Sequence, residues 1–235
     1  MGCFKRAGNG RYRHEYKYLT DSAREAILLT RAAGLMERDL HAGDGGSYLV
    51  RSLYFDDLED SCLWENESGT DLRTKFRLRY YGADSTGVHL EKKSKVHGMT
   101  LKESCPVSEA ECRLLTEGEM PEADSGMPKE KQRLFLEMRL RRLVPKVIVT
   151  YERIPFVYPG GNVRVTFDRN ISSSGDISHF LRGDYGTRPV LAPGSNVLEV
   201  KWDEVLPLHI KEAMGLDTLV WTAFSKYYMC RMFHL

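Results

Sequence analysis

Short runs in which lysine or arginine occupies every second residue are the feature that most restricts how this chain can fold. The clearest run is 75–80 (KFRLRY), and residues 13–18, 91–95 and 164–168 repeat the pattern. Successive side chains of a strand point to opposite faces, so each run places its cations on one face and its apolar residues on the other. Several such strands in one sheet create a densely positive surface. That surface is either a solvated exterior or a site that binds a polyanion.

The overall charge indicates that these cations act locally. The chain carries 34 Lys and Arg against 33 Asp and Glu, a net charge of +1, which excludes a protein that coats nucleic acid through bulk charge. A hydrophobic content of 42% and a charged content of 29% are typical of a folded protein. The length of 235 residues suits one large domain, and we expect a flexible N-terminus over residues 1–10 and a single domain over residues 11–235.

The cysteines and the hydropathy pattern indicate the compartment. Five cysteines are scattered along the chain without a C-x-x-C pair or a zinc-binding cluster, which favours free, mostly buried thiols in a reducing compartment. The sequence has no apolar leader and no stretch near the ~20 apolar residues of a membrane span. We therefore expect a cytoplasmic protein with no membrane segment in this chain, which contacts a membrane only through a separate partner.

Hydrophobic periodicity and turn residues predict strands with helices interspersed. The predicted strands are 11–19, 48–56, 72–81, 88–95, 100–106, 146–151, 156–158, 163–168 and 197–202. The predicted helices are 22–36, 57–66, 108–115, 131–143, 207–214 and 222–233. Residues 172–175 (SSSG) are predicted to be a loop, and Ser108 with Glu111 matches a capping box. Because helices and strands do not alternate regularly, the pattern favours an antiparallel α+β fold.

The alternating cations have two interpretations. Charged residues at every second position are ordinary on the solvated face of an antiparallel sheet. Three observations favour a ligand-filled lumen instead: the same phase recurs in at least six strands, those faces carry few neutral polar residues, and sparse carboxylates share the phase. Cations clamp phosphate oxygens, and carboxylates hold a divalent metal that bridges them. The carboxylates in phase are Glu15, Glu91, Asp168 and Glu199.

Other devices for phosphate chemistry are missing from the sequence. It contains no G-x-x-x-x-G-K-[ST] loop, and Ser225 lacks the G-x-S-x-G context of a hydrolase nucleophile. The seven histidines are scattered, so none is a convincing base or metal ligand. The phase of Arg51 conflicts with that of Ser52 and Tyr54, so we exclude Arg51 from the lumen.

Nine short motifs occur in an order that resembles a known family. They are R-x-E-x-K-Y from Arg13, S-L-Y-F-D from Ser52, K-x-R-x-R-Y from Lys75, L-E-K-K from Leu90, T-L-K-E from Thr100, Y-E-R from Tyr151, R-V-T-F-D from Arg164, L-E-V-K from Leu198 and F-S-K-Y from Phe224. Over residues 11–227 the chain resembles the VTC domain, the polyphosphate polymerase branch of the triphosphate tunnel metalloenzymes (CYTH-like superfamily). The resemblance implies a closed eight-stranded antiparallel β-barrel tunnel with helices packed on the outside. It also implies a phosphotransferase that adds the γ-phosphate of ATP to inorganic polyphosphate and releases ADP, assisted by Mn²⁺ or Mg²⁺.

The resemblance also implies roles for individual residues. The resemblance and the strand alternation together predict a phosphate-binding set of Arg13, Lys17, Lys75, Arg77, Arg79, Lys93, Lys102, Arg153, Arg164, Lys201, Ser225 and Lys226. Within and beside this set, the predicted catalytic residues are Arg77, Arg79, Lys93, Glu199 and Lys226. Glu199 matches the family's metal-coordinating glutamate, and we expect Glu15 or Glu91 to assist it.

One departure from the wider superfamily bears on the reaction. Many tunnel triphosphatases begin with E-x-E-x-K, whereas this chain has Arg13 at the first acidic position and keeps Glu15 and Lys17. A second metal ion, which helps activate water, therefore has fewer ligands. This favours a polymerase that binds ATP and polyphosphate. The alternatives are a tunnel triphosphatase acting on tripolyphosphate or nucleoside triphosphate, and a catalytically silent polyphosphate-binding module. We expect no nucleic-acid partner.

Overall fold

The computed structural model describes residues 12–43, 45–67, 72–82, 85, 87–122, 124 and 126–235. The predicted flexible N-terminus over residues 1–10 lies outside the described residues. The single domain over residues 11–235 stays a prediction. No helix in the described part of the chain is long and apolar enough to cross a membrane. The four described cysteines are free and buried, as expected; they are Cys62, Cys105, Cys112 and Cys230.

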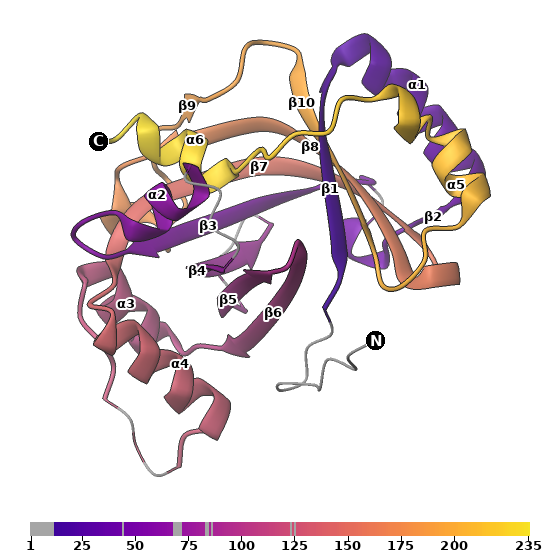
Figure 1. Cartoon of the computed structure of the whole chain (residues 1–235). Coiled ribbons are helices and arrows are strands. Elements are labelled where there is room, and N and C mark those ends of the chain that lie inside the picture. Colours follow the sequence, from indigo (N-terminus) through magenta and orange to yellow (C-terminus); the bar gives the residue numbers. More distant parts are fainter. Residues whose placement is uncertain are drawn as a thin grey trace.

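Eight strands of the described chain form a strongly curled antiparallel sheet (Figure 1). In spatial order they are β1 (His14–Asp21), β10 (Ser195–Trp202), β8 (Val163–Ser174), β7 (Val144–Tyr158), β3 (Tyr48–Asp56), β4 (Arg73–Tyr81), β5 (His89–Val96) and β6 (Met99–Pro106). Two short strands extend the sheet: β2 (Glu37–Arg38) pairs with β7, and β9 (Arg188–Pro189) pairs with β8. The predicted antiparallel α+β class is confirmed.

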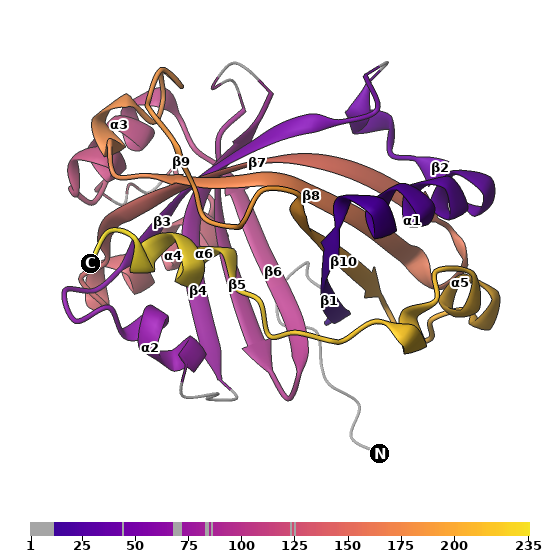
Figure 2. The same cartoon turned by 90° about the horizontal axis from the view of Figure 1, so that it is seen from above.

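The expectation of a closed barrel is wrong for the described residues. The edge strands β1 and β6 meet only at an antiparallel bridge, where Arg13 and Thr100 exchange two backbone hydrogen bonds of 2.9 Å. The register explains this, because Thr100 lies beside the β5–β6 turn and the rest of β1 runs past that turn. Beyond the bridge, β1 contacts the C-terminal segment instead: the amide of Thr222 donates a hydrogen bond to the carbonyl of Lys17 at 2.9 Å. Figure 2 shows this segment running beside β1 toward α6.

Four of the regular helices cover the convex face of the sheet, where the apolar residues of the alternating strands point. Helices α3 (Glu109–Glu117) and α4 (Lys129–Leu140) pack on β3, β4 and β5. Helices α1 (Ser22–Leu35) and α5 (Leu208–Ala213) pack on β1, β7, β8 and β10. Apolar side chains of the strands, such as Phe76 and Leu78, are fully buried beneath them. The predicted outward direction of the apolar faces is confirmed.

The other two regular helices correct the expectation that all helices lie outside. Helices α2 (Ser61–Glu67) and α6 (Lys226–Met232) share a buried cluster with Val147, Val149 and Tyr151 of β7. These residues are in phase with Arg153, which points into the concave side, so α2 and α6 cover one end of the concave face. The reason is that this end of β7 carries valines instead of cations, and an apolar surface requires cover.

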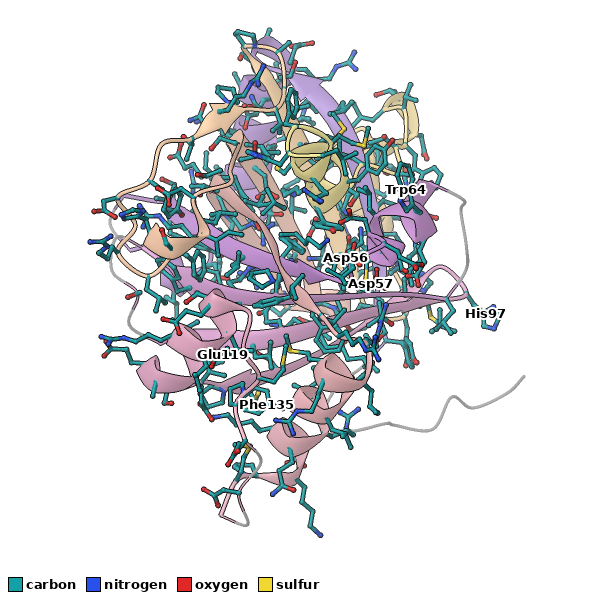
Figure 3. The ribbon with its side chains drawn as sticks, turned by 90° about the vertical axis from the view of Figure 1, so that its left-hand side faces the viewer. Asp56, Asp57, Trp64, His97, Glu119 and Phe135 are labelled. Atoms are coloured by element: carbon teal, nitrogen blue, oxygen red, sulfur yellow. The ribbon has the colours of Figure 1, made fainter. Side chains whose placement is uncertain are left out.

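The Asp56 carboxylate connects β3 with α2 and α6 at this end of the fold. Its carboxylate, at the end of β3, accepts hydrogen bonds from the amides of Cys62 (2.9 Å) and Leu63 (3.1 Å) in α2 and from the hydroxyl of Tyr227 (2.6 Å) in α6. Figure 3 views the side chains of this region, with Asp56 and Asp57 near α2. The last helix begins at Lys226 rather than at residue 222. Ser225 is its N-cap, because the Ser225 hydroxyl accepts a hydrogen bond from the Tyr228 amide at 3.2 Å.

Two strands are longer than predicted. Residues 146–151 and 156–158 belong to one strand, β7. Pro155 lies beyond the start of β3, and it takes part in pairing on that side through its carbonyl, which accepts a hydrogen bond from the Asp39 amide at 3.3 Å. Residues 172–174 are not a loop but the end of β8, where Ser172 and Ser173 pair with β7 and β9. The capping box of Ser108 and Glu111 is confirmed. Four short 3₁₀ turns complete the described elements: η1 (Leu40–Ala42), η2 (Gly160–Asn162), η3 (Ile177–His179) and η4 (Leu216–Thr218).

Candidate active site

The concave side of the sheet encloses a cavity of about 340 Å³. All twelve predicted phosphate-binding residues line it. Ten come from β1, β4, β5, β6, β7, β8, β10 and the start of α6, while Arg13 directly precedes β1 and Ser225 directly precedes α6. Arg51 is not among the lining residues; its guanidinium donates to the carbonyl of Gly82 at 2.7 Å, as its opposite phase predicted. The other lining residues are Glu15, Tyr54, Tyr81, Thr100, Tyr151, Asn162, Glu199, Asp203 and Tyr227.

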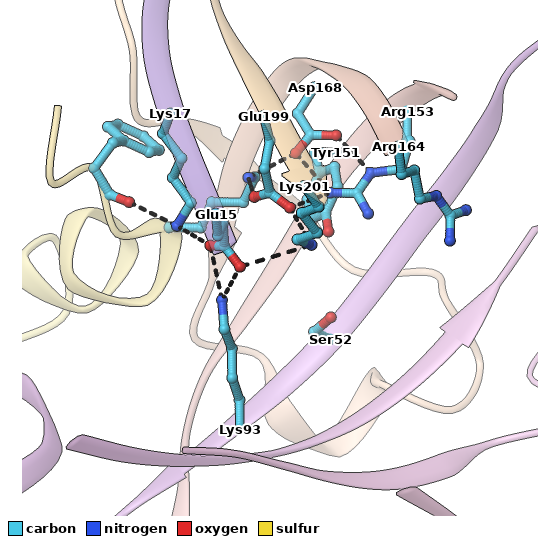
Figure 4. Close-up of polar contacts among 12 residues, drawn as sticks. Glu15, Lys17, Ser52, Lys93, Tyr151, Arg153, Arg164, Asp168, Glu199 and Lys201 are labelled. Atoms are coloured by element: carbon cyan, nitrogen blue, oxygen red, sulfur yellow. Dashed lines mark hydrogen bonds and ion pairs between the residues drawn. The ribbon is translucent and has the colours of Figure 1, made fainter. Parts of the chain in front are cut away.

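Glu15 is at the centre of a lysine cluster (Figure 4). Its carboxylate lies 3.0 Å from the ammonium of Lys17, 2.8 Å from that of Lys93 and 3.8 Å from that of Lys201. Burial alone would raise the pKa of Glu15, but Lys93 and Lys17 hold it well below its usual range. Lys201 also forms an ion pair with Glu199, so the two carboxylates lie on either side of one ammonium group.

Asp168 anchors a second cluster, deeper in the fold. It accepts two hydrogen bonds from the guanidinium of Arg153, at 2.7 and 2.8 Å, and lies 2.6 Å from the ammonium of Lys226. Its side chain is fully buried, and it does not line the cavity. Burial would lower the pKa of Arg153, but Asp168 keeps it well above its usual value. Asp168 therefore positions two cations that face the cavity; the sequence pattern showed its phase but not this role.

Glu91 has a similar position behind the cations. Its carboxylate accepts from Arg77 at 2.8 Å and Lys102 at 2.9 Å and lies 3.6 Å from Arg79. It is 2% exposed and does not line the cavity. The structure thus places Glu91 as a partner of three cations rather than beside the space where a metal would bind.

Four tyrosines that were not among the predicted site residues also line the cavity, namely Tyr54, Tyr81, Tyr151 and Tyr227. The hydroxyl of Tyr54 accepts from Arg77 at 2.8 Å, and the Tyr54 ring stacks on that of Tyr227 with centroids 5.1 Å apart. The ring of Tyr151 lies 4.9 Å from the ammonium of Lys226. Tyr151 shares the phase of Arg153 in Y-E-R, which is the signal that could have identified it. The strand of Tyr54 has no cation in the same phase; Tyr54 faces the cavity beside its cross-strand neighbour Arg77.

Two of the lysines that line the cavity have unusually low pKa values. Burial, together with the nearby charges of Lys17 and Lys93, lowers the pKa of Lys75 to about 7. Burial also lowers the pKa of Lys93 to about 7, and the nearby charges of Lys17 and Lys201 add to this effect, while Glu15 and Glu199 oppose it. Below pH 7 both ammonium groups are charged, and above it both lose protons. A bound polyanion favours the charged form, so it raises both pKa values.

The low pKa values of these lysines predict that the protein takes up protons when it binds a polyanion. At pH 8, tripolyphosphate binding to the wild-type protein is expected to take up about one proton more than binding to Lys75→Met, because Lys75 is then mostly neutral until the anion binds. Calorimetry in two buffers with different ionisation enthalpies measures the difference. The difference should shrink at pH 6, where Lys75 is already charged. Lys92→Met is the control, since Lys92 pairs with Glu137 on the convex side. Equal uptake by Lys75→Met and wild type would contradict the prediction.

The carboxylates limit how a metal could be held. In the described part of the chain, no group of three or more His, Cys, Asp or Glu side chains has an arrangement that could hold a metal ion. Glu15 and Glu199 are two carboxylates that line the cavity and flank Lys201. Mg²⁺-type ions are commonly held by one or two carboxylates together with substrate phosphates. The donor set therefore fits a divalent ion that arrives with a phosphate ligand.

Comparison with known proteins identifies the family. The sequence profile of the VTC domain matches residues 12–233. No curated protein matches the chain. Among solved structures, the fold is similar to a proposed adenylate cyclase from Bacillus halodurans, at 16% identity and a TM-score of 0.51 over 88% of both chains. It is also similar to a proposed adenylyl cyclase from Hippeastrum described as having a dominant triphosphatase activity, at 13% identity and a TM-score of 0.54, over 95% of this chain and 96% of that chain. At these identities the structures show the fold alone, whereas the profile match spans nearly the whole chain. The protein therefore belongs to the VTC domain family, and it has the fold of the triphosphate tunnel proteins.

Proposed function

We propose that the protein is a polyphosphate polymerase that transfers the γ-phosphate of ATP to a growing inorganic polyphosphate chain and releases ADP. The observation that carries the proposal is the charge of the cavity: eleven lysines and arginines line it against three carboxylates, in a chain whose net charge is only +1. So many cations around one space repel one another unless a polyanion or solvent ions fill it. A triphosphate and a phosphate chain supply that charge. The match to the VTC domain supports the same reaction.

The geometry supports a mechanism based on positioning and charge. Phosphoryl transfer requires in-line placement and stabilisation of charge on the moving group more than covalent help from the protein. Arg77, Arg79, Lys93 and Lys226 would clamp the triphosphate. The terminal phosphate oxygen of the chain attacks the γ-phosphorus, the bond from that phosphorus to the β-phosphate oxygen breaks, and ADP leaves with the bonding electrons. A phosphate end is largely ionised at neutral pH, so the attack requires no general base.

A divalent ion fits this scheme at one place. Glu15 and Glu199 would hold Mg²⁺ or Mn²⁺, which when bound supplies neutralising charge to the phosphate oxygens. The protein's own contribution there is to fix the two carboxylates: Lys17 and Lys93 fix Glu15, and Lys201 fixes Glu199. The free, buried thiols of the described residues and the proposed use of ATP support a cytoplasmic location.

A tunnel triphosphatase is the second candidate. The activity described for the Hippeastrum structure favours it. Against it stands Arg13, which lines the cavity where many tunnel triphosphatases carry an acid, so that water activation by a second metal has one ligand fewer.

One assay distinguishes the candidates. The purified protein is incubated with ATP and Mn²⁺ or Mg²⁺, and products are resolved by length on a gel while ADP and free phosphate are measured. Long chains with equimolar ADP support the polymerase. Free phosphate alone identifies a triphosphatase, and tight polyphosphate binding without turnover identifies a binding module.

A further inference from the structure

Tyr54 lies where the apolar end of the concave face meets the cavity lined by cations. Its side chain belongs to the buried cluster beneath α2 and α6, and it also lines the cavity. The ring stacks on that of Tyr227 with centroids 5.1 Å apart, and Tyr54 as a whole is 6% exposed. The ring is therefore fixed, and the hydroxyl is the group that contacts the charged wall.

Cations surround this hydroxyl. It accepts a hydrogen bond from the guanidinium of Arg77 at 2.8 Å. Burial alone would raise the pKa of Tyr54, but the charges of Arg77, Arg79 and Lys226 lower it. All three cations line the cavity, and all three belong to the clamp for the triphosphate. The hydroxyl of Tyr54 thus lies among the groups that would hold the phosphates.

The proton of this hydroxyl has no acceptor among the described residues. Arginine and lysine side chains only donate hydrogen bonds. In the part of the chain that the structure describes, the one hydrogen bond of the Tyr54 hydroxyl is the bond that it accepts from Arg77. The stacked Tyr227 differs, because its hydroxyl donates to Asp56 at 2.6 Å. Buried donors are normally paired, so an anion in the cavity is the acceptor that fits the Tyr54 proton.

We propose that the Tyr54 hydroxyl donates a hydrogen bond to an oxygen of the phosphoryl group that is transferred, and that Tyr54 is therefore a catalytic residue. This rests on the proposed function, because the acceptor is a phosphate oxygen of the nucleotide. Tyr54 is a neutral donor within a ring of cations, and its direction is set by the stacked ring and by Arg77.

The proposed contact requires no proton transfer. The bond from the γ-phosphorus to the bridging oxygen breaks, its electron pair stays on the ADP that leaves, and the attacking oxygen of the chain forms the new bond. The phenol keeps its proton throughout. Its hydrogen bond strengthens as the charge distribution on the phosphate oxygens changes, and a donor fixed in advance requires no reorganisation at that moment.

Tyr54→Phe tests the contact by removing one oxygen atom. The kcat for ATP turnover, measured as ADP release, should fall about 10²-fold, the usual cost of losing one preorganised donor. The KM for ATP should stay near the wild-type value, because the cations still bind the ground state. The phenylalanine ring can keep the stack on Tyr227, and Arg77 keeps two contacts with Glu91, at 2.8 and 2.7 Å.

The matched control is Tyr158→Phe. It also removes one tyrosine hydroxyl, but Tyr158 packs against the cluster beneath α1 and α5 on the convex side, where its ring contacts that of His209. Its kcat should equal that of wild type. Circular dichroism checks the fold of both variants.

Replacement of Tyr54 by 3-fluorotyrosine separates a direct contact from an effect through Arg77. Fluorine makes the phenol a stronger donor and a weaker acceptor. At pH 6, which favours the protonated phenol, a hydroxyl that donates to phosphate should give a kcat at or above that of wild type. A hydroxyl that serves only as an acceptor for Arg77 should give a lower kcat, and that result would overturn the proposal.

The kinetic constants of Tyr54→Phe decide the role. An unchanged kcat overturns the proposal, and so does a raised KM with an unchanged kcat, because the hydroxyl would then bind substrate and transition state equally. An equal loss in Tyr158→Phe overturns it as well.

Failure of this proposal and failure of the proposed function are separable. If the wild-type protein releases free phosphate from ATP and makes no chains, the polymerase is rejected, but Tyr54→Phe should lower that hydrolysis by the same factor, since the same bond breaks. Normal chain synthesis by a folded Tyr54→Phe retains the polymerase and rejects the role of Tyr54. If the wild-type protein turns over neither ATP nor tripolyphosphate, both proposals fail.

Discussion

Arg77→Ala is expected to lower the initial rate of ATP-dependent chain formation by about 10²–10³-fold, the usual cost of losing one preorganised charge-stabilising donor. The guanidinium lines the cavity, and its direction is fixed by Glu91 at 2.8 Å and by Tyr54 at 2.8 Å. A group held this way requires no reorganisation when charge develops on the transferred phosphate. The measurement is ADP release together with chain length on a gel.

Two further variants sharpen this experiment. Arg77→Lys keeps the charge but loses the planar fork, so it should fall between wild type and Arg77→Ala. Lys92→Ala is the matched control, because Lys92 lies opposite Phe76 on the neighbouring strand and pairs with Glu137 on the convex side. Circular dichroism checks the fold of each variant. Normal chain synthesis by a folded Arg77→Ala would exclude the clamp mechanism.

The alternation of cations predicted which side chains line the cavity because it depends on a local rule. Lys75, Arg77 and Arg79 lie at every second residue of one strand, and any sheet would place them on the same face. That face could be identified as the inside only from the shared phase of many strands and from the motif order. The twelve predicted phosphate-binding positions line the cavity for this reason.

What the sequence did not reveal depends on contacts between distant segments. Glu91 shares the phase of the cations, yet its cross-strand neighbour Arg77 and the adjacent Arg79 and Lys102 surround its carboxylate. Phase alone does not show which of two neighbouring side chains on the same face reaches the cavity. The sequence also does not show whether the barrel closes, because closure depends on the register between β1 and β6.

The concave helices show a further limit. Val147 and Val149 have the phase of Arg153, and a rule based on charge alone treats this face of β7 as lumen throughout. The change from cations to valines marks the place where α2 and α6 begin to cover it. Lys226 reaches the cavity because α6 lies on that apolar end, and this placement joins residues about 80 apart in the sequence.

Asp168→Asn is expected to lower the free energy of unfolding by about 3–5 kcal/mol, the usual cost of breaking a buried ion pair from one side. The substitution keeps the shape and removes the charge. Arg153 and Lys226 are 7% and 8% exposed, and their remaining acidic neighbour is Glu199, at 4.0 Å from each. Two buried cations would then share one distant carboxylate. For a chain of this size each kcal/mol corresponds to about 2–4 °C in Tm.

A control and a rescue separate this charge effect from general damage. Asp176→Asn removes an exposed carboxylate paired with His179 and should leave the unfolding midpoint unchanged. Tripolyphosphate should stabilise Asp168→Asn more than wild type, because a polyanion bound near Arg153 and Lys226 replaces the missing negative charge and a ligand that binds only the folded state raises its stability. Chemical denaturation with and without tripolyphosphate measures both effects. Equal stability of Asp168→Asn and Asp176→Asn would mean that Glu199 alone balances the two cations, and that the cavity tolerates its excess charge without Asp168.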